Sequence, residues 1–123
     1  MWIRRRAEEW LKREGKSIDG PFRTSKLHTP EKTSKHVHYW WFEVEEELVE
    51  SSPKRFVHLL GQMGAGSDDF CHLKVPFAFL KENKALLSFR SDGKYSLELS
   101  AEEGNTFRDL RGSGKVSFEE FVQ

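Results

Sequence analysis

The sequence predicts an α+β fold: a mostly antiparallel β-sheet of about five strands, with an N-terminal helix and a short helix after strand three. Three observations lead to this prediction. An amphipathic segment with helical spacing opens the chain. Several later segments alternate apolar and polar residues with the two-residue period of a strand. Asp92-Gly93 lies between two of these segments, which is a strong signal for a hairpin.

Residues 3–14 are expected to form the N-terminal helix. Ile3, Ala7, Trp10 and Leu11 recur at the spacing of one helical face, and Gly15 suits the position that follows the last turn. Residues 16–36 have the composition of a loop, because Gly, Pro, Ser, Thr and Lys dominate them.

The first strand is expected over residues 37–49. Trp40, Phe42, Val44 and Leu48 share one parity and are predicted to face the core. Tyr39 and Trp41 share the other parity, so they are predicted to lie on the less buried face. The aromatic residues of this strand therefore divide between core and surface.

The rest of the chain is expected to be mainly β-structure. Pro76 is expected in the first turn of the short helix, which would bury Phe77, Phe79 and Leu80. The last segment, 115–122, fits a strand or a helix. The remaining predicted elements are strands at 55–60, 70–75, 86–90 and 94–99, and a short helix at 105–110.

Length and composition predict one domain over residues 1–123. It would comprise the N-terminal helix (1–15), a basic loop (16–36) and a β-rich body (37–123). No apolar run approaches the roughly 18–20 residues that span a bilayer, so no membrane partner is expected. A single cysteine, Cys71, and a start without a signal-peptide pattern lead us to expect a cytoplasmic protein.

Charge is unevenly distributed along the chain. The first 40 residues hold ten basic and five acidic residues, a net charge of +5, whereas residues 41–123 have a net charge of −5. The basic part ends in Tyr39-Trp40-Trp41. Cations neutralise phosphates and aromatic rings stack on bases, so this segment predicts a nucleic-acid contact. The predicted contact residues are Arg23, Lys26, Lys32, Lys35, Tyr39 and Trp41. The alternative is a solvated loop that leads into a core strand.

No catalytic residue, metal ligand or cofactor is assigned. Residues 109–120 resemble a calcium-binding EF-hand loop, but Arg111 occupies a ligand position and a strand precedes the loop. Five histidines and Cys71 lack the spacing of a zinc site. Cys71 and His72 are neighbours on a strand and point to opposite faces, which excludes them as a nucleophile and its base.

Four segments together resemble small domains encoded with bacterial restriction and DNA-processing enzymes. The resemblance spans residues 22–121, and it implies an accessory or DNA-contacting role without implying any catalytic residue. The segments are His28-Thr29-Pro30-Glu31-Lys32, Tyr39-Trp40-Trp41-Phe42-Glu43-Val44, Phe70-Cys71-His72-Leu73-Lys74-Val75-Pro76 and Arg111-Gly112-Ser113-Gly114-Lys115-Val116.

The leading hypothesis is a nucleic-acid-binding or accessory module of a bacterial restriction-type system, with DNA as the expected nucleic acid. The second hypothesis is a protein-interaction domain that docks a partner through its acidic part. A metal-dependent nuclease is the third hypothesis, in which a metal ion would be bound by acidic residues: Glu43, Glu45, Glu46 and Glu47, with Asp68 and Asp69.

Overall fold

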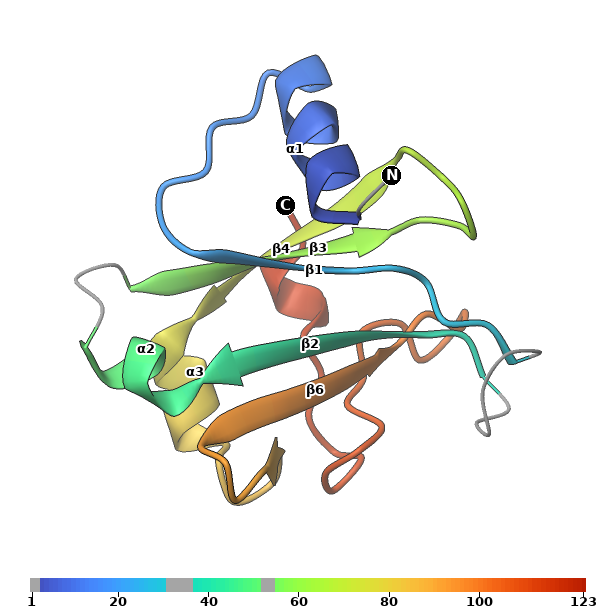
Figure 1. Ribbon diagram of the computed structural model, residues 1–123. Helices are drawn as coiled ribbons and strands as arrows, with labels where there is room; N and C mark the ends of the chain where they lie inside the picture. The colour runs from blue at the N-terminus through green and yellow to red at the C-terminus, as the bar shows by residue number, and fades with distance from the viewer. Residues whose placement is uncertain (1–2, 31–36, 52–54) are drawn as a thin grey trace.

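Two small β-sheets form the framework of the protein (Figure 1), in a computed structural model that describes residues 3–30, 37–51 and 55–123. The first sheet has the order β1 (Phe22–Ser25), β3 (Phe56–Gln62) and β4 (Phe70–Pro76). The second sheet has the order β2 (Tyr39–Glu45), β6 (Lys94–Ser100) and β5 (Ser88–Phe89). The α+β class is therefore confirmed. The predicted number of about five strands is roughly consistent with the six strands of the described residues, but these form two sheets and not the single sheet that was expected.

Helix α1 (Ile3–Arg13) covers the outer face of the first sheet (Figure 1). The predicted apolar stripe is confirmed, since Ala7, Trp10 and Leu11 are buried. The helix ends at a left-handed Gly15, and the N–H of Lys16 bonds to the carbonyl of Leu11 at 2.9 Å. This arrangement is a Schellman cap, which satisfies the last carbonyls of the helix.

Strand β1 lies within the segment predicted as a loop. It pairs in parallel with β3, and Phe22 is opposite His58. Beyond β1 the chain continues beside β2, where His28 and Tyr39 form an isolated antiparallel bridge. The loop prediction for 16–36 is wrong over β1, because pairing with β3, which is distant in sequence, stabilises a four-residue segment that local turn signals such as Gly20-Pro21 mark as a loop.

The strand predicted over residues 37–49 is shorter than expected. β2 ends at Glu45, and helix α2 (Glu46–Ser51) follows it directly. Glu46 and Glu47 lie in the first helical turn, where acidic side chains interact favourably with the helix dipole. Leu48 consequently belongs to a helix. The predicted short helix after β4 is confirmed as α3 (Phe77–Glu82), with Pro76 at its N-cap.

The main hydrophobic core lies between the two sheets. Its fully buried side chains include Phe42, Val44, Leu59, Leu73 and Leu97. Trp40 stacks on Phe107, with ring centroids 5.3 Å apart, and donates a hydrogen bond from its Nε1 to the carbonyl of Gln62 at 2.7 Å. A smaller apolar cluster joins α1 to Leu60 and Phe70.

The C-terminal segment crosses from the second sheet to the first without regular strands. The helix predicted at 105–110 is absent from the described residues, since Asp109 instead bridges to Leu99 of β6 and Arg108 bridges to Ser117. The 3-10 helix η2 (Glu119–Phe121) follows, and Val122 bridges to Leu73 of β4. Long-range backbone pairing therefore replaces local helical bonds here.

Substitution of Gly61 by Ala should disturb the junction of the two sheets. A Cβ atom at Gly61 would lie 2.8 Å from Nε1 of the buried Trp40, so the indole would have to move. We expect a loss of about 1–3 kcal/mol in the free energy of unfolding, measured by urea denaturation.

Gly64→Ala is the matched control for this change. The nearest atom to a Cβ at Gly64 is Cβ of Ser67 at 3.8 Å, which is an ordinary contact. The control should change stability by less than about 0.5 kcal/mol. Equal effects of the two substitutions would show that the Trp40–Gly61 contact is unimportant.

Candidate functional site

Trp41 presents an aromatic ring on the outer face of β2. Its side chain is 38% exposed, whereas its neighbours Trp40 and Phe42 are buried. The backbone N–H of Trp41 donates to Oγ of Ser25 on β1, and its indole Nε1 donates to Oγ of Ser96 on β6, both at 2.9 Å. The indole is therefore held in place, and its own N–H group is already satisfied.

Tyr39 lies on the same side of β2 but is not available as a contact. Only 8% of the residue is exposed, because the ring of His28 stacks on it at 4.8 Å with an interplanar angle of 12°. Two backbone hydrogen bonds, of 2.9 and 3.1 Å, hold the two residues together. The prediction of Tyr39 as an exposed ring is wrong, and the half-buried His28 is the more exposed member of the stacked pair.

The predicted basic contacts differ in their availability. Arg23 donates to Oε2 of Glu45 at 2.5 Å and to the carbonyl of Phe22 at 2.9 Å. Burial raises the pKa of Glu45, but the hydrogen bond and the charge of Arg23 outweigh burial and lower it. Lys26 is exposed. Lys32 and Lys35 lie outside the described residues. Arg23 is thus already engaged, and Lys26 is the predicted cation that the structure places at the surface.

We call the surface formed by Lys26, His28, Tyr39 and Trp41 the Trp41 face. Sequence analysis missed His28, although it shares the parity of Lys26 in a segment that lies beside β2. The pKa of His28 is lowered, mainly by burial and then by the charge of Lys26, while Glu98 acts in the opposite direction. At neutral pH this imidazole is therefore uncharged.

Three acidic residues on the side of the second sheet that carries Trp41 are each paired with an arginine. Glu98, directly opposite Trp41 on β6, is 4% exposed and lies 3.6 Å from Arg111. Glu43 pairs with Arg90, and Glu45 with Arg23. The surroundings of the indole ring are therefore close to neutral.

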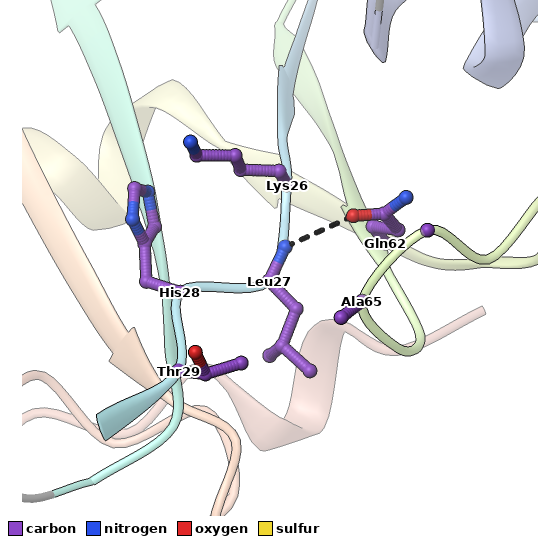
Figure 2. A pocket seen from close by; sticks show the side chains of 7 residues that line it. Lys26, Leu27, His28, Thr29, Gln62 and Ala65 are labelled. Carbon is purple, nitrogen blue, oxygen red and sulfur yellow. Dashed lines mark hydrogen bonds between the residues drawn. The ribbon is translucent and has the colours of Figure 1, made fainter. Parts of the chain in front are cut away.

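A hollow of about 200 Å³ adjoins the Trp41 face (Figure 2). One wall is the segment Lys26–Thr29, and the other is the turn after β3, where Ala65 and Gly66 lie. Gln62 joins the two walls, since its Oε1 accepts from the N–H of Leu27 at 3.3 Å and its Nε2 donates to the carbonyl of Ser67 at 2.9 Å. Lys26 and His28 belong both to this hollow and to the Trp41 face.

A second, larger hollow of about 580 Å³ lies at one end of the core. Its lining is mostly apolar and includes Trp40, Met63, Cys71, Phe107 and Val122. Burial raises the pKa of the Cys71 thiol to about 11, so the thiol is protonated and unreactive at neutral pH. This agrees with the prediction that Cys71 faces the core.

His58 and His72 form a buried pair under the loop that follows α1. Nδ1 of His58 lies 2.8 Å from Nε2 of His72, and the two residues are only 4% and 9% exposed. Burial, followed by the charges of His58, Lys16 and Lys74, lowers the pKa of His72 to about 4. The pKa of His58 is also lowered, with burial as the largest cause. Both rings are therefore neutral at pH 7.

The described residues contain no group of three or more His, Cys, Asp or Glu side chains that would hold a metal ion. In the EF-hand-like segment, Asp109 is fully buried and its carboxylate accepts hydrogen bonds from the N–H groups of Arg111 and Gly112 at 3.2 and 2.9 Å. Its oxygens thus stabilise a turn. Within the described chain, no helix has the length and apolar character needed to cross a membrane.

Comparisons with protein-family models, with curated proteins and with solved structures found no match to this chain.

The His58–His72 pair should make stability depend on pH. Both folded-state pKa values lie below the ordinary value of 6.5, so the unfolded chain binds more protons in acid. Stability is complete above about pH 6.5 and falls as the pH drops toward 4. Between pH 7 and pH 5 we expect a loss of about 1–2 kcal/mol, measured by urea denaturation.

His72→Gln should flatten this pH dependence, because an amide can replace the hydrogen bond to His58 without titrating. If the variant and the parent lose stability equally between pH 7 and pH 5, the pair is not the source of the effect.

Cys71 should react slowly with a thiol-specific disulfide reagent. Because its pKa is raised to about 11, the folded protein should react about two orders of magnitude more slowly than the urea-unfolded chain at pH 8. Similar rates in the two states would contradict the raised pKa of the half-buried Cys71 thiol.

Proposed function

We propose that this protein is a non-catalytic nucleic-acid-binding module and that the Trp41 face is its contact surface. The observation that supports this most directly is the exposed indole of Trp41, whose Nε1 donates to Ser96 while the backbone N–H of the same residue donates to Ser25. Stacking of bases on aromatic side chains contributes about 1–3 kcal/mol per base. A ring that is already immobilised loses little conformational entropy on binding.

Cations beside the ring would supply the contacts to phosphates. Lys26 is exposed at the edge of the Trp41 face, and Lys32 and Lys35 follow a few residues later in the sequence. Each neutralised phosphate releases counterions, which strengthens binding at low salt. Arg23 has a different role in this proposal: its ion pair with Glu45 joins β1 to β2.

We further propose a bacterial restriction-type or other DNA-processing system as the setting. The support for this setting is the resemblance of four sequence segments to domains encoded with such enzymes. In that setting the protein would act as an accessory that holds nucleic acid, while a separate protein carries out the chemistry.

A protein-interaction domain is the second candidate function. The observation that favours it is the set of acid–arginine pairs around Trp41, formed by Glu43, Glu45 and Glu98. A near-neutral surface around an exposed aromatic residue is also typical of a protein interface, where Trp and Arg are enriched.

Binding of fluorescein-labelled oligonucleotides, measured by fluorescence anisotropy, tests the leading proposal. Affinity should fall as salt concentration rises, and Lys26→Ala should weaken binding about threefold to tenfold at low salt. The control is Lys12→Ala, which removes an exposed lysine from α1, on the far side of the first sheet. Absence of binding at low salt by the unmodified protein would refute the proposal, and equal effects of the two substitutions would refute the role of Lys26.

A further inference from the structure

We infer that the Trp41 face selects single-stranded nucleic acid with unpaired bases over a duplex. This inference rests on the proposed function and specifies its ligand. Three features of the described residues lead to it: the shortage of unpaired cations, the fixed indole ring and the adjoining hollow.

The first feature is electrostatic. Arg23, Arg90 and Arg111 are each paired with a carboxylate on the side of the second sheet that carries Trp41. Among the described residues of the Trp41 face, Lys26 is the one lysine or arginine. A duplex displays its phosphates and hides the faces of its bases, so a protein that binds it without base contacts depends on many cations. The described residues of this face lack that density of charge, so most of the affinity must come from the bases.

The second feature is the orientation of Trp41. Its Nε1 reaches Ser96, which is diagonal to Trp41 in the register of β2 and β6. The ring therefore extends across the neighbouring strand. Because the N–H group is occupied, the exposed part of the side chain offers its π-surface rather than a hydrogen-bond donor. Every base has a matching π-surface, but in a duplex that surface is covered by the neighbouring base pairs.

The third feature is the hollow beside Lys26 (Figure 2). At about 200 Å³ it is smaller than the pockets that hold drug-sized ligands, and its size suits one heterocyclic base. Leu27 and Ala65 provide apolar contacts, while His28 and Thr29 bring polar groups to its lining. Lys26 lies where the hollow meets the Trp41 face. A flexible single strand would place one base on Trp41, the next phosphate at Lys26 and a second base in the hollow.

The test compares labelled single-stranded DNA, single-stranded RNA and duplex DNA of the same length, by anisotropy over a salt series. Single strands should bind at least tenfold more tightly than the duplex. The logarithmic salt slope should be shallow, on the order of −2 or less in magnitude, since three lysines at most contact phosphate. The DNA and RNA arms show which single strand is preferred.

Two sets of variants test the two base positions. Trp41→Ala should weaken single-strand binding about tenfold or more, whereas Trp41→Phe should retain much of the affinity because a ring remains. Ala65→Leu should weaken binding by filling the hollow. Ala65 is exposed in a turn, so the larger side chain should not unfold the protein, and Ala78→Leu on the exposed side of α3 is the matched control.

The outcomes separate this inference from the proposed function. Equal or tighter binding of the duplex overturns single-strand selection and leaves nucleic-acid binding intact. Absence of binding to all three ligands refutes both. If Trp41→Ala weakens binding but Ala65→Leu behaves like Ala78→Leu, the hollow is not a base site, and the part of the inference that depends on it fails.

Discussion

The placement of Trp40 is the constraint on which the rest of this structure depends. Its indole lies against Gly61, where the absence of a side chain leaves room, and donates to the carbonyl of Gln62. It also stacks on Phe107 from the C-terminal segment. One side chain thereby joins β2, β3 and the connection that follows β6. Because neighbours on a strand point to opposite faces, a buried Trp40 forces Trp41 outward. The exposed ring at the candidate site is thus a consequence of core packing.

Helix α1 stabilises one wall of the hollow beside Lys26, from the opposite side of the first sheet. Arg6 donates to the carbonyl of Gly66 at 3.0 Å, and Arg13 donates to the carbonyl of Asp68 at 2.6 Å. Both arginines therefore hold the turn that forms one wall of the hollow beside Lys26. These two arginines therefore make their contacts within the protein and are not available to a ligand. Arg4 likewise lies over the ring of Phe22, 4.1 Å from its centroid. The net charge of +5 over the first 40 residues overstates the positive charge available to a ligand.

On this surface, fewer cations and fewer aromatic rings are available to a ligand than the charge pattern of the sequence implied. The sequence predicted four cations and two rings as contacts. The structure leaves Lys26 and Trp41 exposed, uses Arg23 in an ion pair and covers Tyr39 with His28. The indole of Trp41, bonded through Nε1 to Ser96, with its backbone N–H bonded to Ser25, is a rigid platform. The acidic residues on the same side of the sheet are paired with arginines, which reduces the local net charge. These conditions favour recognition of flat, uncharged surfaces over recognition of a dense row of phosphates.

The sequence by itself determined α1, the inward residues of β2, the helix after Pro76 and the hairpin at Asp92-Gly93, because each is set by local interactions. Each of these features depends on hydrophobic periodicity or on a turn residue, and both signals come from residues that are close together in the sequence. Tertiary structure alone decided β1, the division into two sheets, the start of α2 and the irregular C-terminal segment. Those features depend on partners distant in sequence, such as His58 for Phe22 or Leu99 for Asp109. The same holds for the site: parity placed Trp41 on the surface, but only long-range contacts covered Tyr39 and engaged Arg23.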